Sequence, residues 1–193
     1  MNLLVLGPQG SGKGTQAKRI AAERGIPHVS TGDMFRAAIE AGTELGRQVE
    51  PILASGELVP DELTVSLIRE RLSEPDAAHG FVLDGFPRNL AQVDALEAML
   101  AEIGRSLDAV LFFDLSDERA LERLVGRAGN ERRHDDSPEV IARRLEIYHE
   151  QTEPVVEYYR ATGKLVPLHA ERSIGDVAAE IGEALDLVEG AAA

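Results

Sequence analysis

The chain has 193 residues, a net charge of −14 at pH 7 and no cysteine. This length suits one domain with small insertions, and no apolar run is long enough to span a bilayer. The negative charge argues against non-specific binding to nucleic acid or an anionic membrane, and the lack of cysteine excludes disulfides and thiolate metal sites and favours the cytoplasm.

Short apolar runs alternate with helical patterns along the chain. We expect strands at Leu3–Leu6, Pro27–Ser30, Phe81–Asp84, Ala109–Leu115 and Lys164–Leu168. The helical patterns between and after them cover Gly14–Arg24, Leu90–Ile103, Asp117–Val125, Pro138–Ala161 and Ile174–Val188. This alternation predicts an α/β fold with a parallel five-stranded sheet and helices on both faces. Ligands bind such sheets at the carboxyl ends of the strands, where Gly7, Ser30 and Asp84 fall.

A glycine-rich loop follows the first predicted strand. Residues 7–15 read GPQGSGKGT, and Gly7, Gly12 and Lys13 satisfy the pattern G-x-x-x-x-G-K. The glycines let successive backbone N–H groups turn toward an anion, and the lysine and the following helix N-terminus add positive charge. An ordinary glycine turn is the alternative, but the position between a strand and a helix favours the phosphate loop of a P-loop NTPase fold.

One interval interrupts the alternation of strands and helices. Between Ser30 and Phe81 lie three helical segments, at Gly32–Glu40, Glu44–Ala54 and Asp61–Ser73. Turn signals surround the first two. We expect a small helical insertion at the sheet edge, which serves either as extra packing or as a flap that binds a second ligand.

A second group of polar residues ends the third predicted strand. Asp84 is followed by Gly85, Phe86, Pro87 and Arg88, and Gln92 comes one helical turn later. A carboxylate beside a phosphate loop suits Mg²⁺ held through water, and Arg88 would point into the same cleft. The alternative is ordinary turn chemistry, because aspartate, glycine and proline are common turn residues.

Arginines gather again in residues 126–136, a polar and glycine-bearing segment expected to form a loop between two helices. Such a loop can close over a site. Arg144 lies on the following helix. Alternatively, these arginines are solvated residues paired with neighbouring acids.

Taken together, the motifs resemble the adenylate kinases from Leu3 to about Val188. They are GPQGSGKGTQ at 7–16, STGDMFR at 30–36, GELVPDE at 56–62, GFVLDGFPRN at 80–89 with Gln92, RLVGR at 123–127, RRHDD at 132–136, ARRLEIY at 142–148 and EPVVEYY at 153–159. The resemblance implies a core at 1–29, 60–125 and 137–193, an AMP-binding insertion at 30–59 and a short lid at 126–136. It also implies reversible phosphoryl transfer from MgATP to AMP, giving two ADP.

The resemblance assigns roles to individual positions. ATP would be bound by Gly10, Ser11, Gly12, Lys13, Gly14, Thr15 and Arg127, and by the backbone carbonyl of Arg172. AMP would be bound by Thr31, Arg36, Glu57, Leu58, Val59, Gly85, Phe86, Pro87, Arg88, Gln92, Arg133 and Arg144. The catalytic cations would be Lys13, Arg88, Arg123, Arg127, Arg133 and Arg144, and Asp84 would hold Mg²⁺ through water.

The expected chemistry needs no general base, because a phosphate oxygen of AMP is already anionic at neutral pH. Catalysis then rests on positioning and charge neutralisation, so none of the five histidines is given a role. The short lid and the absence of cysteine imply no structural zinc. The expected partners are ATP, AMP and ADP, with no nucleic acid or membrane, and the family suggests a cytoplasmic monomer.

Three other functions are considered. A UMP/CMP kinase usually carries alanine where this chain has Thr31 and asparagine where it has Gln92. A P-loop module that binds nucleotide without catalysis would lose some of Asp84, Arg88, Arg133 and Arg144, all of which are present. A shikimate-type kinase should lack the DGFPR and STGD segments.

Overall fold

The computed structural model describes residues 1–130 and 137–192. Its central element is a parallel five-stranded sheet in the order β2-β3-β1-β4-β5. The strands are β1 (Asn2–Leu6), β2 (His28–Ser30), β3 (Phe81–Asp84), β4 (Ala109–Asp114) and β5 (Leu165–His169). The predicted α/β fold and parallel sheet are therefore confirmed, with strand ends within about two residues of the predicted ones.

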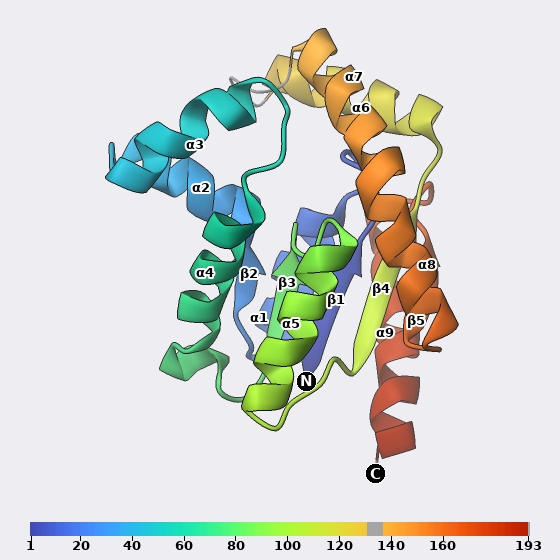
Figure 1. Ribbon diagram of the computed structural model, residues 1–193. Coiled ribbons are helices and arrows are strands. Elements are labelled where there is room, and N and C mark those ends of the chain that lie inside the picture. Colours follow the sequence, from blue (N-terminus) through green and yellow to red (C-terminus); the bar gives the residue numbers. More distant parts are fainter. Residues whose placement is uncertain (131–136, 193) are drawn as a thin grey trace.

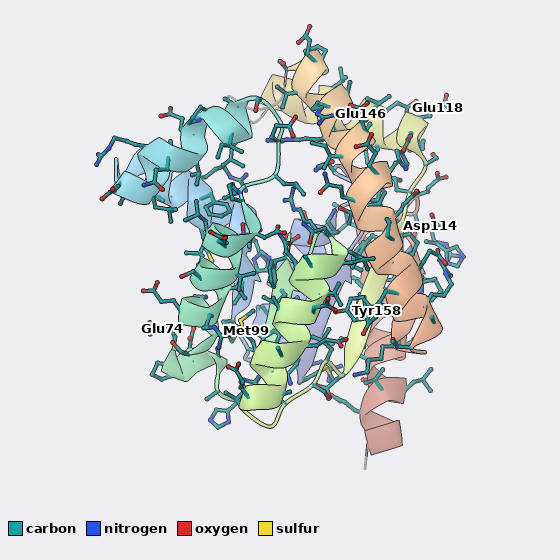
Figure 2. All side chains as sticks on the ribbon, viewed as in Figure 1. Glu74, Met99, Asp114, Glu118, Glu146 and Tyr158 are labelled. Atoms are coloured by element: carbon teal, nitrogen blue, oxygen red, sulfur yellow. The ribbon has the colours of Figure 1, made fainter. Side chains whose placement is uncertain are left out.

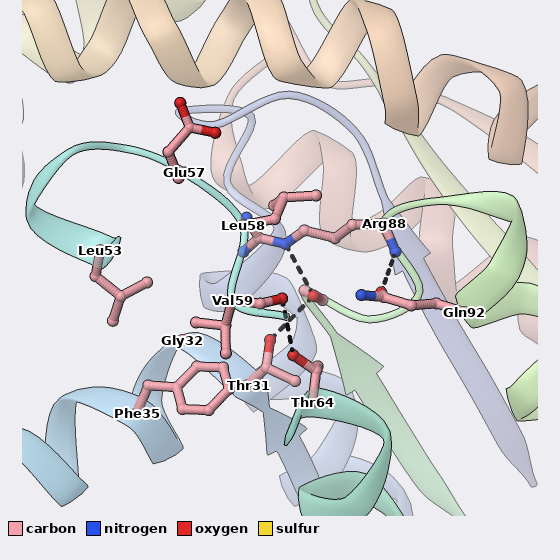
Figure 3. Close-up of a pocket in the computed structure, with 11 residues that line it drawn as sticks. Thr31, Gly32, Phe35, Leu53, Glu57, Leu58, Val59, Thr64, Arg88 and Gln92 are labelled. Carbon is pink, nitrogen blue, oxygen red and sulfur yellow. Dashed lines mark hydrogen bonds between the residues drawn. The ribbon is translucent and has the colours of Figure 1, made fainter. Parts of the chain in front are cut away.

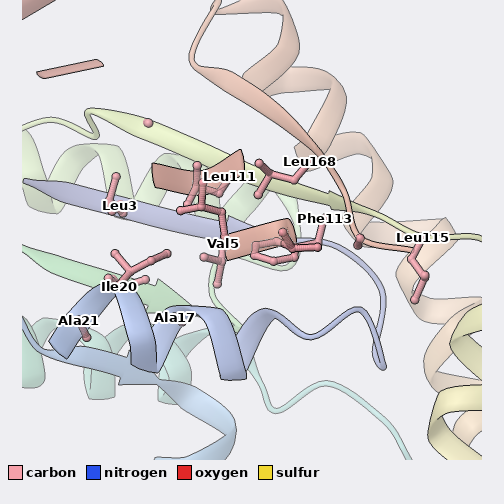
Figure 4. Close-up of a cluster of buried hydrophobic side chains, with 14 of the residues drawn as sticks. Leu3, Val5, Ala17, Ile20, Ala21, Leu111, Phe113, Leu115 and Leu168 are labelled. Carbon is pink, nitrogen blue, oxygen red and sulfur yellow. The ribbon is translucent and has the colours of Figure 1, made fainter. Parts of the chain in front are cut away.

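Helices cover both faces of the sheet (Figure 1). Leu3 and Val5 of β1 pack on one face with α1 (Lys13–Arg24) and α9 (Ile174–Ala192), as Figure 4 shows for Ile20 of α1. Leu4 and Leu6 pack on the other face with α4 (Asp61–Leu72), α5 (Leu90–Glu102) and α8 (Glu153–Ala161). Burial on both faces explains why the strand sequences are apolar throughout.

Two helices form an arm beside the carboxyl end of the sheet, α2 (Thr31–Glu40) and α3 (Glu44–Ala54). The Ser30 side chain accepts a hydrogen bond from the backbone of Asp33 to cap α2, and Thr43 caps α3 in the same way. The arm has its own small core around Phe35, Val49 and Val59. Of the three helical segments predicted in this interval, α2 and α3 form the arm, whereas α4 packs on the sheet through Ile68 and Leu72 and contributes Leu63 and Leu67 to the core of the arm.

Opposite this arm lie α6 (Asp117–Asn130) and α7 (Pro138–Ile147) (Figure 1). The prediction that α6 ends at Val125 and a loop begins at 126 is wrong, because the helix continues through Asn130. Its glycines suggested a loop, yet each costs only about 1 kcal/mol relative to alanine, and extending an existing helix adds one hydrogen bond per residue.

The segment predicted as one helix over 138–161 is divided. A π-helical turn at Tyr148–Thr152 separates α7 from α8. Pro154, the second residue of α8, has no N–H to donate to the carbonyl four residues earlier. The regular α-helical pattern is therefore interrupted there, and the backbone changes to wider spacing.

The acidic character of the chain is concentrated on its outer surface. Glu74, Glu118 and Glu146 are exposed, and Figure 2 shows their side chains extending away from the body of the protein.

A short 3-10 turn at Pro75–Ala77 completes the described elements. Within residues 1–130 and 137–192, no helix has the length and apolar character that crossing a membrane requires.

Candidate active site

The glycine loop between β1 and α1 has the geometry that its sequence predicts. Gly7, Gly10 and Gly12 have φ values of 141°, 83° and 88°. A Cβ at position 7 would lie 2.5 Å from the carbonyl oxygen of Phe113, so this position requires glycine. Lys13 donates from Nζ to the carbonyl oxygens of Gly7 at 2.6 Å and Pro8 at 2.7 Å. Its ammonium group is thus held directly beside the loop.

A cavity of about 610 Å³ opens at the carboxyl end of the sheet. Because β1 and β3 are neighbours, with Val5 opposite Asp84, the glycine loop and the 84–88 segment face the same space. Predicted residues that line it are Gly10, Gly12, Lys13, Gly14, Thr15, Arg36, Glu57, Leu58, Asp84, Gly85, Pro87, Arg88, Arg123 and Arg144. The fold therefore brings most of the predicted site together.

Asp84 lies at the end of β3, beside the start of α1. Its side chain is 14% exposed, and Oδ2 lies 3.3 Å from Nε2 of His28. The same oxygen lies 3.4 Å from where a Cβ would be at Gly14, so the carboxylate faces the start of α1. Among the described residues, no three metal-ligating side chains form a cluster. One carboxylate fits Mg²⁺, which keeps several waters and takes further oxygens from phosphates.

Four arginines line the cavity: Arg36, Arg88, Arg123 and Arg144. Burial, together with repulsion from Arg144 and Arg36, lowers the pKa of the Arg88 guanidinium. Arg88 is held in place because Nε donates to the Gly85 carbonyl at 2.9 Å and its own carbonyl accepts from Thr152 Oγ1 at 2.9 Å. Cations that repel one another across a cleft form a site that an anion stabilises.

A narrower pocket of about 30 Å³ adjoins this cavity, and the two share Leu58, Gly85 and Arg88 in their walls. Figure 3 shows apolar walls formed by Phe35 and Val59, with Gln92 at the other side. The pocket is bounded by Thr31, whose hydroxyl donates to the Gly85 carbonyl at 3.0 Å. The lining of this pocket is therefore mostly apolar, with polar groups from Thr31, Arg88 and Gln92.

A family model described as Adenylate kinase matches residues 5–164. The chain belongs to the adenylate kinase family. An adenylate kinase from Stenotrophomonas maltophilia strain K279a is 46% identical, covering 94% of this chain and 97% of that protein. One from Parvibaculum lavamentivorans is 47% identical over 97% and 93% of the two chains, and one from Xanthomonas campestris pv. campestris strain 8004 is 46% identical over 96% and 99%.

Membership of the adenylate kinase family makes this protein a phosphotransferase that acts reversibly between ATP and AMP. The expected small-molecule substrates are those of the family. Adenylate kinases use Mg²⁺ with ATP, and the position of Asp84 agrees with that requirement.

Several positions named by the adenylate kinase resemblance lie away from the open cavity or are already paired. Ser11 is 3% exposed and accepts from Lys13 Nζ. Phe86 is fully buried in the core and lines neither cavity. The Glu57 carboxylate accepts from Arg143 Nε at 2.7 Å. Arg172 lines neither cavity and is 55% exposed. The side chain of Arg127 and all of Arg133 lie outside the described residues.

The structure also places at the site three residues that were given no role from the sequence. Ile174 lines the larger cavity, is 65% exposed and accepts at its carbonyl from Gln16 Nε2 at 2.8 Å. Thr152 and Asp61 hold Arg88 and Gln92 in place. Asp61 lies in the quoted segment 56–62, whereas Thr152 and Ile174 lie in no quoted motif. The role of each depends on a contact with a distant part of the chain, which the sequence does not show.

Proposed function

We propose that ATP binds over the glycine loop, that AMP binds in the pocket lined by Thr31, Val59 and Gln92, and that the phosphoryl group passes between them in the larger cavity. The observation that carries this proposal is the convergence of Arg36, Arg88 and Arg144 in the cleft that also contains Lys13. This is the charge distribution that two facing phosphate chains require.

The reaction as proposed depends on positioning. Lys13 and Arg123 would bind the phosphates of ATP, and Arg88 and Arg144 would bind the group in transfer, while Arg36 binds the phosphate of AMP. Because the attacking oxygen is already anionic, no side chain has to remove a proton. We extend the same role to Arg127 and Arg133 on the basis of the family motifs alone.

Asp84 would hold Mg²⁺ through bound water. When present, the metal neutralises negative charge on the ATP phosphates. The contribution of the protein is a fixed carboxylate at the end of β3, close to the start of α1. His28, at 3.3 Å, limits the directions in which that carboxylate can turn.

Binding of AMP would require the α2–α3 arm to move. The pocket of about 30 Å³ holds roughly one water molecule, far less than a nucleobase needs. The arm has its own core of Phe35, Val49 and Val59, so it can shift as a unit without exposing the main core. Leu58 and Val59 would then contact the base.

We further propose that the ATP base packs near the exposed side chain of Ile174, with the Arg172 backbone carbonyl nearby. We also infer a cytoplasmic monomer that binds neither nucleic acid nor membrane, since the exposed acidic surface repels both. Size-exclusion chromatography with light scattering checks the monomer, with a mass near 20.9 kDa as the expected result.

A coupled assay with ATP and a panel of nucleoside monophosphates tests the assignment of the two pockets. AMP should give two ADP, and CMP and UMP should be poor acceptors. Faster transfer to CMP than to AMP would contradict the assignment of the acceptor pocket while leaving the glycine loop intact.

A further inference from the structure

Gln92 is buried, with 2% of its surface exposed, and both ends of its side-chain amide are already committed. Its Oε1 accepts a hydrogen bond from the Arg88 backbone N–H at 2.8 Å, which Figure 3 shows as a dashed line. Its Nε2 donates to Oδ1 of Asp61 at 2.6 Å. A backbone N–H can only donate and a carboxylate can only accept, so these two partners allow one orientation of the amide.

Asp61 is itself held in place. The Asn89 side chain donates from Nδ2 to both carboxylate oxygens of Asp61, at 2.9 and 3.2 Å. Asn89 Oδ1 accepts from the Gln92 backbone N–H at 2.9 Å, which caps α5. Asp61 lies in the first turn of α4, where the helix dipole favours a negative charge. The carboxylate therefore has little freedom to follow a rotated Gln92 amide.

We propose that Asp61 is a specificity-determining residue, which fixes the Gln92 amide so that the acceptor pocket selects bases with an exocyclic amino group over bases with an oxo group. This inference rests on the proposed function, in which Gln92 faces the base of AMP. With its two fixed partners, the amide keeps one N–H and one lone pair for that base. An amino group beside an unprotonated ring nitrogen matches this pair.

An oxo base presents the reverse order, a carbonyl oxygen beside a ring N–H. To match it, the Gln92 amide would have to rotate by half a turn. Its NH₂ would then meet the Arg88 N–H, and its oxygen would meet the Asp61 carboxylate. A donor would then face a donor and an acceptor would face an acceptor. Both contacts are unfavourable at a buried position, because the groups cannot form hydrogen bonds to water instead. Cytosine carries the same amino pattern as adenine, so this mechanism does not separate CMP from AMP.

IMP is the sharpest probe, because its base differs from adenine in carrying an oxo group and a ring N–H in place of the amino group and ring nitrogen. The proposed variant is Asp61→Asn, whose amide can either accept from or donate to Gln92. We expect the ratio of kcat/KM for AMP to kcat/KM for IMP to fall by about tenfold or more, the discrimination typical of a good pair of hydrogen bonds. The KM for ATP should not change.

Glu62→Gln is the matched control, since Glu62 is an exposed carboxylate next in sequence in the first turn of α4. It should leave the AMP to IMP ratio unchanged. A second test places Asp61→Asn in a Gln92→Ala background. If Asp61 acts through Gln92, it should have no further effect on the ratio there, whereas a purely structural role would still lower activity. Asp61→Ser replaces Asp61→Asn if thermal melting shows that the latter is unfolded.

Two failures are distinguishable. If the wild-type protein does not convert ATP and AMP to ADP, the proposed function is wrong. If it does so and excludes IMP, but Asp61→Asn lowers kcat/KM for AMP and for IMP by the same factor, the proposed function stands and the proposed role of Asp61 is wrong.

Discussion

The two halves of the cleft are built in different ways. The phosphate loop comes from one uninterrupted stretch, residues 7–15, fixed to the buried strand β1 and to α1. The acceptor pocket is assembled from separate segments that contribute Thr31, Val59, Arg88 and Gln92. The first is held between two elements of the main core, while the second lies partly on an arm with a small core of its own.

The loop therefore depends on residues close together in the sequence, and the pocket depends on contacts between segments far apart in it. The shape of the phosphate loop follows from glycines whose φ values other residues rarely adopt, so substitutions there act on the loop directly. The acceptor pocket depends on how α4 and α5 pack and on where the arm rests. Substitutions in the loop should therefore abolish phosphoryl transfer to every acceptor. Substitutions in the pocket should have kinetic effects that differ from one acceptor to another.

The largest effect is expected for Lys13→Met. This substitution removes the charge beside the phosphate loop, and kcat should fall by about 10²-fold or more with every acceptor. Steady-state kinetics measures the loss, and circular dichroism checks that the fold is retained. Lys164→Met at the start of β5 is the control and should keep wild-type activity. A Lys13 variant within a few-fold of wild type would contradict the phosphate-loop assignment.

Arg144→Ala should give the next largest effect, a loss of about 10²-fold in kcat/KM for AMP. The guanidinium faces Arg88 across the cavity, so its removal weakens the positive field on the transferred group. Arg160→Ala, which removes an exposed arginine paired only at the surface of α8, is the control. The melting temperatures of both variants should be close to that of wild type. If Arg144→Ala and Arg160→Ala lower kcat/KM by the same factor, Arg144 has no role in the site.

Asp84 lies between the two halves of the cleft, and Asp84→Asn tests its role. It keeps the shape of the side chain and removes the charge that would hold hydrated Mg²⁺, so apparent Mg²⁺ affinity and turnover should each fall about tenfold. A Mg²⁺ titration of initial rates measures both. An unchanged titration curve would make Asp84 a structural turn residue.

The smallest effect concerns a contact outside both halves. Hydrogen bonds to Asp117 and Glu153 raise the pKa of His149, which ties α6 to the π-helical turn. Because the folded pKa is raised, this stabilisation is complete below about pH 6.5 and is lost as pH rises through the folded pKa. For a side chain 41% exposed it should not exceed about 1 kcal/mol.

Urea unfolding of wild type and His149→Gln, at about pH 6 and about pH 9, tests this pH dependence. The difference in stability between the two proteins should be larger at the lower pH. The same difference at both values would mean that the charge on His149 contributes nothing.

Much of the fold and the phosphate loop could be predicted from the sequence, because buried strands and glycine turns leave local patterns. The continuation of α6 to Asn130 could not, because it depends on marginal helix propensities. The sequence does show Pro154, but a proline alone does not specify that the backbone before it forms a π turn at 148–152. Phe86 was grouped with AMP ligands by its position in a motif, and only packing shows its side chain fully buried. Similarly, the contact between Asp61 of α4 and Gln92 of α5 joins residues 31 positions apart in the sequence.

Calorimetric titration with a mimic that joins two adenosines through five phosphates tests most directly whether one cleft binds both nucleotides. Both halves of the cleft should accept the mimic at once, so one molecule should bind per chain. Its affinity should exceed that of ATP or AMP alone by about 100-fold or more, because one ligand gathers both sites. Binding of two mimics per chain, or an affinity no better than that of ATP, would contradict a shared cleft.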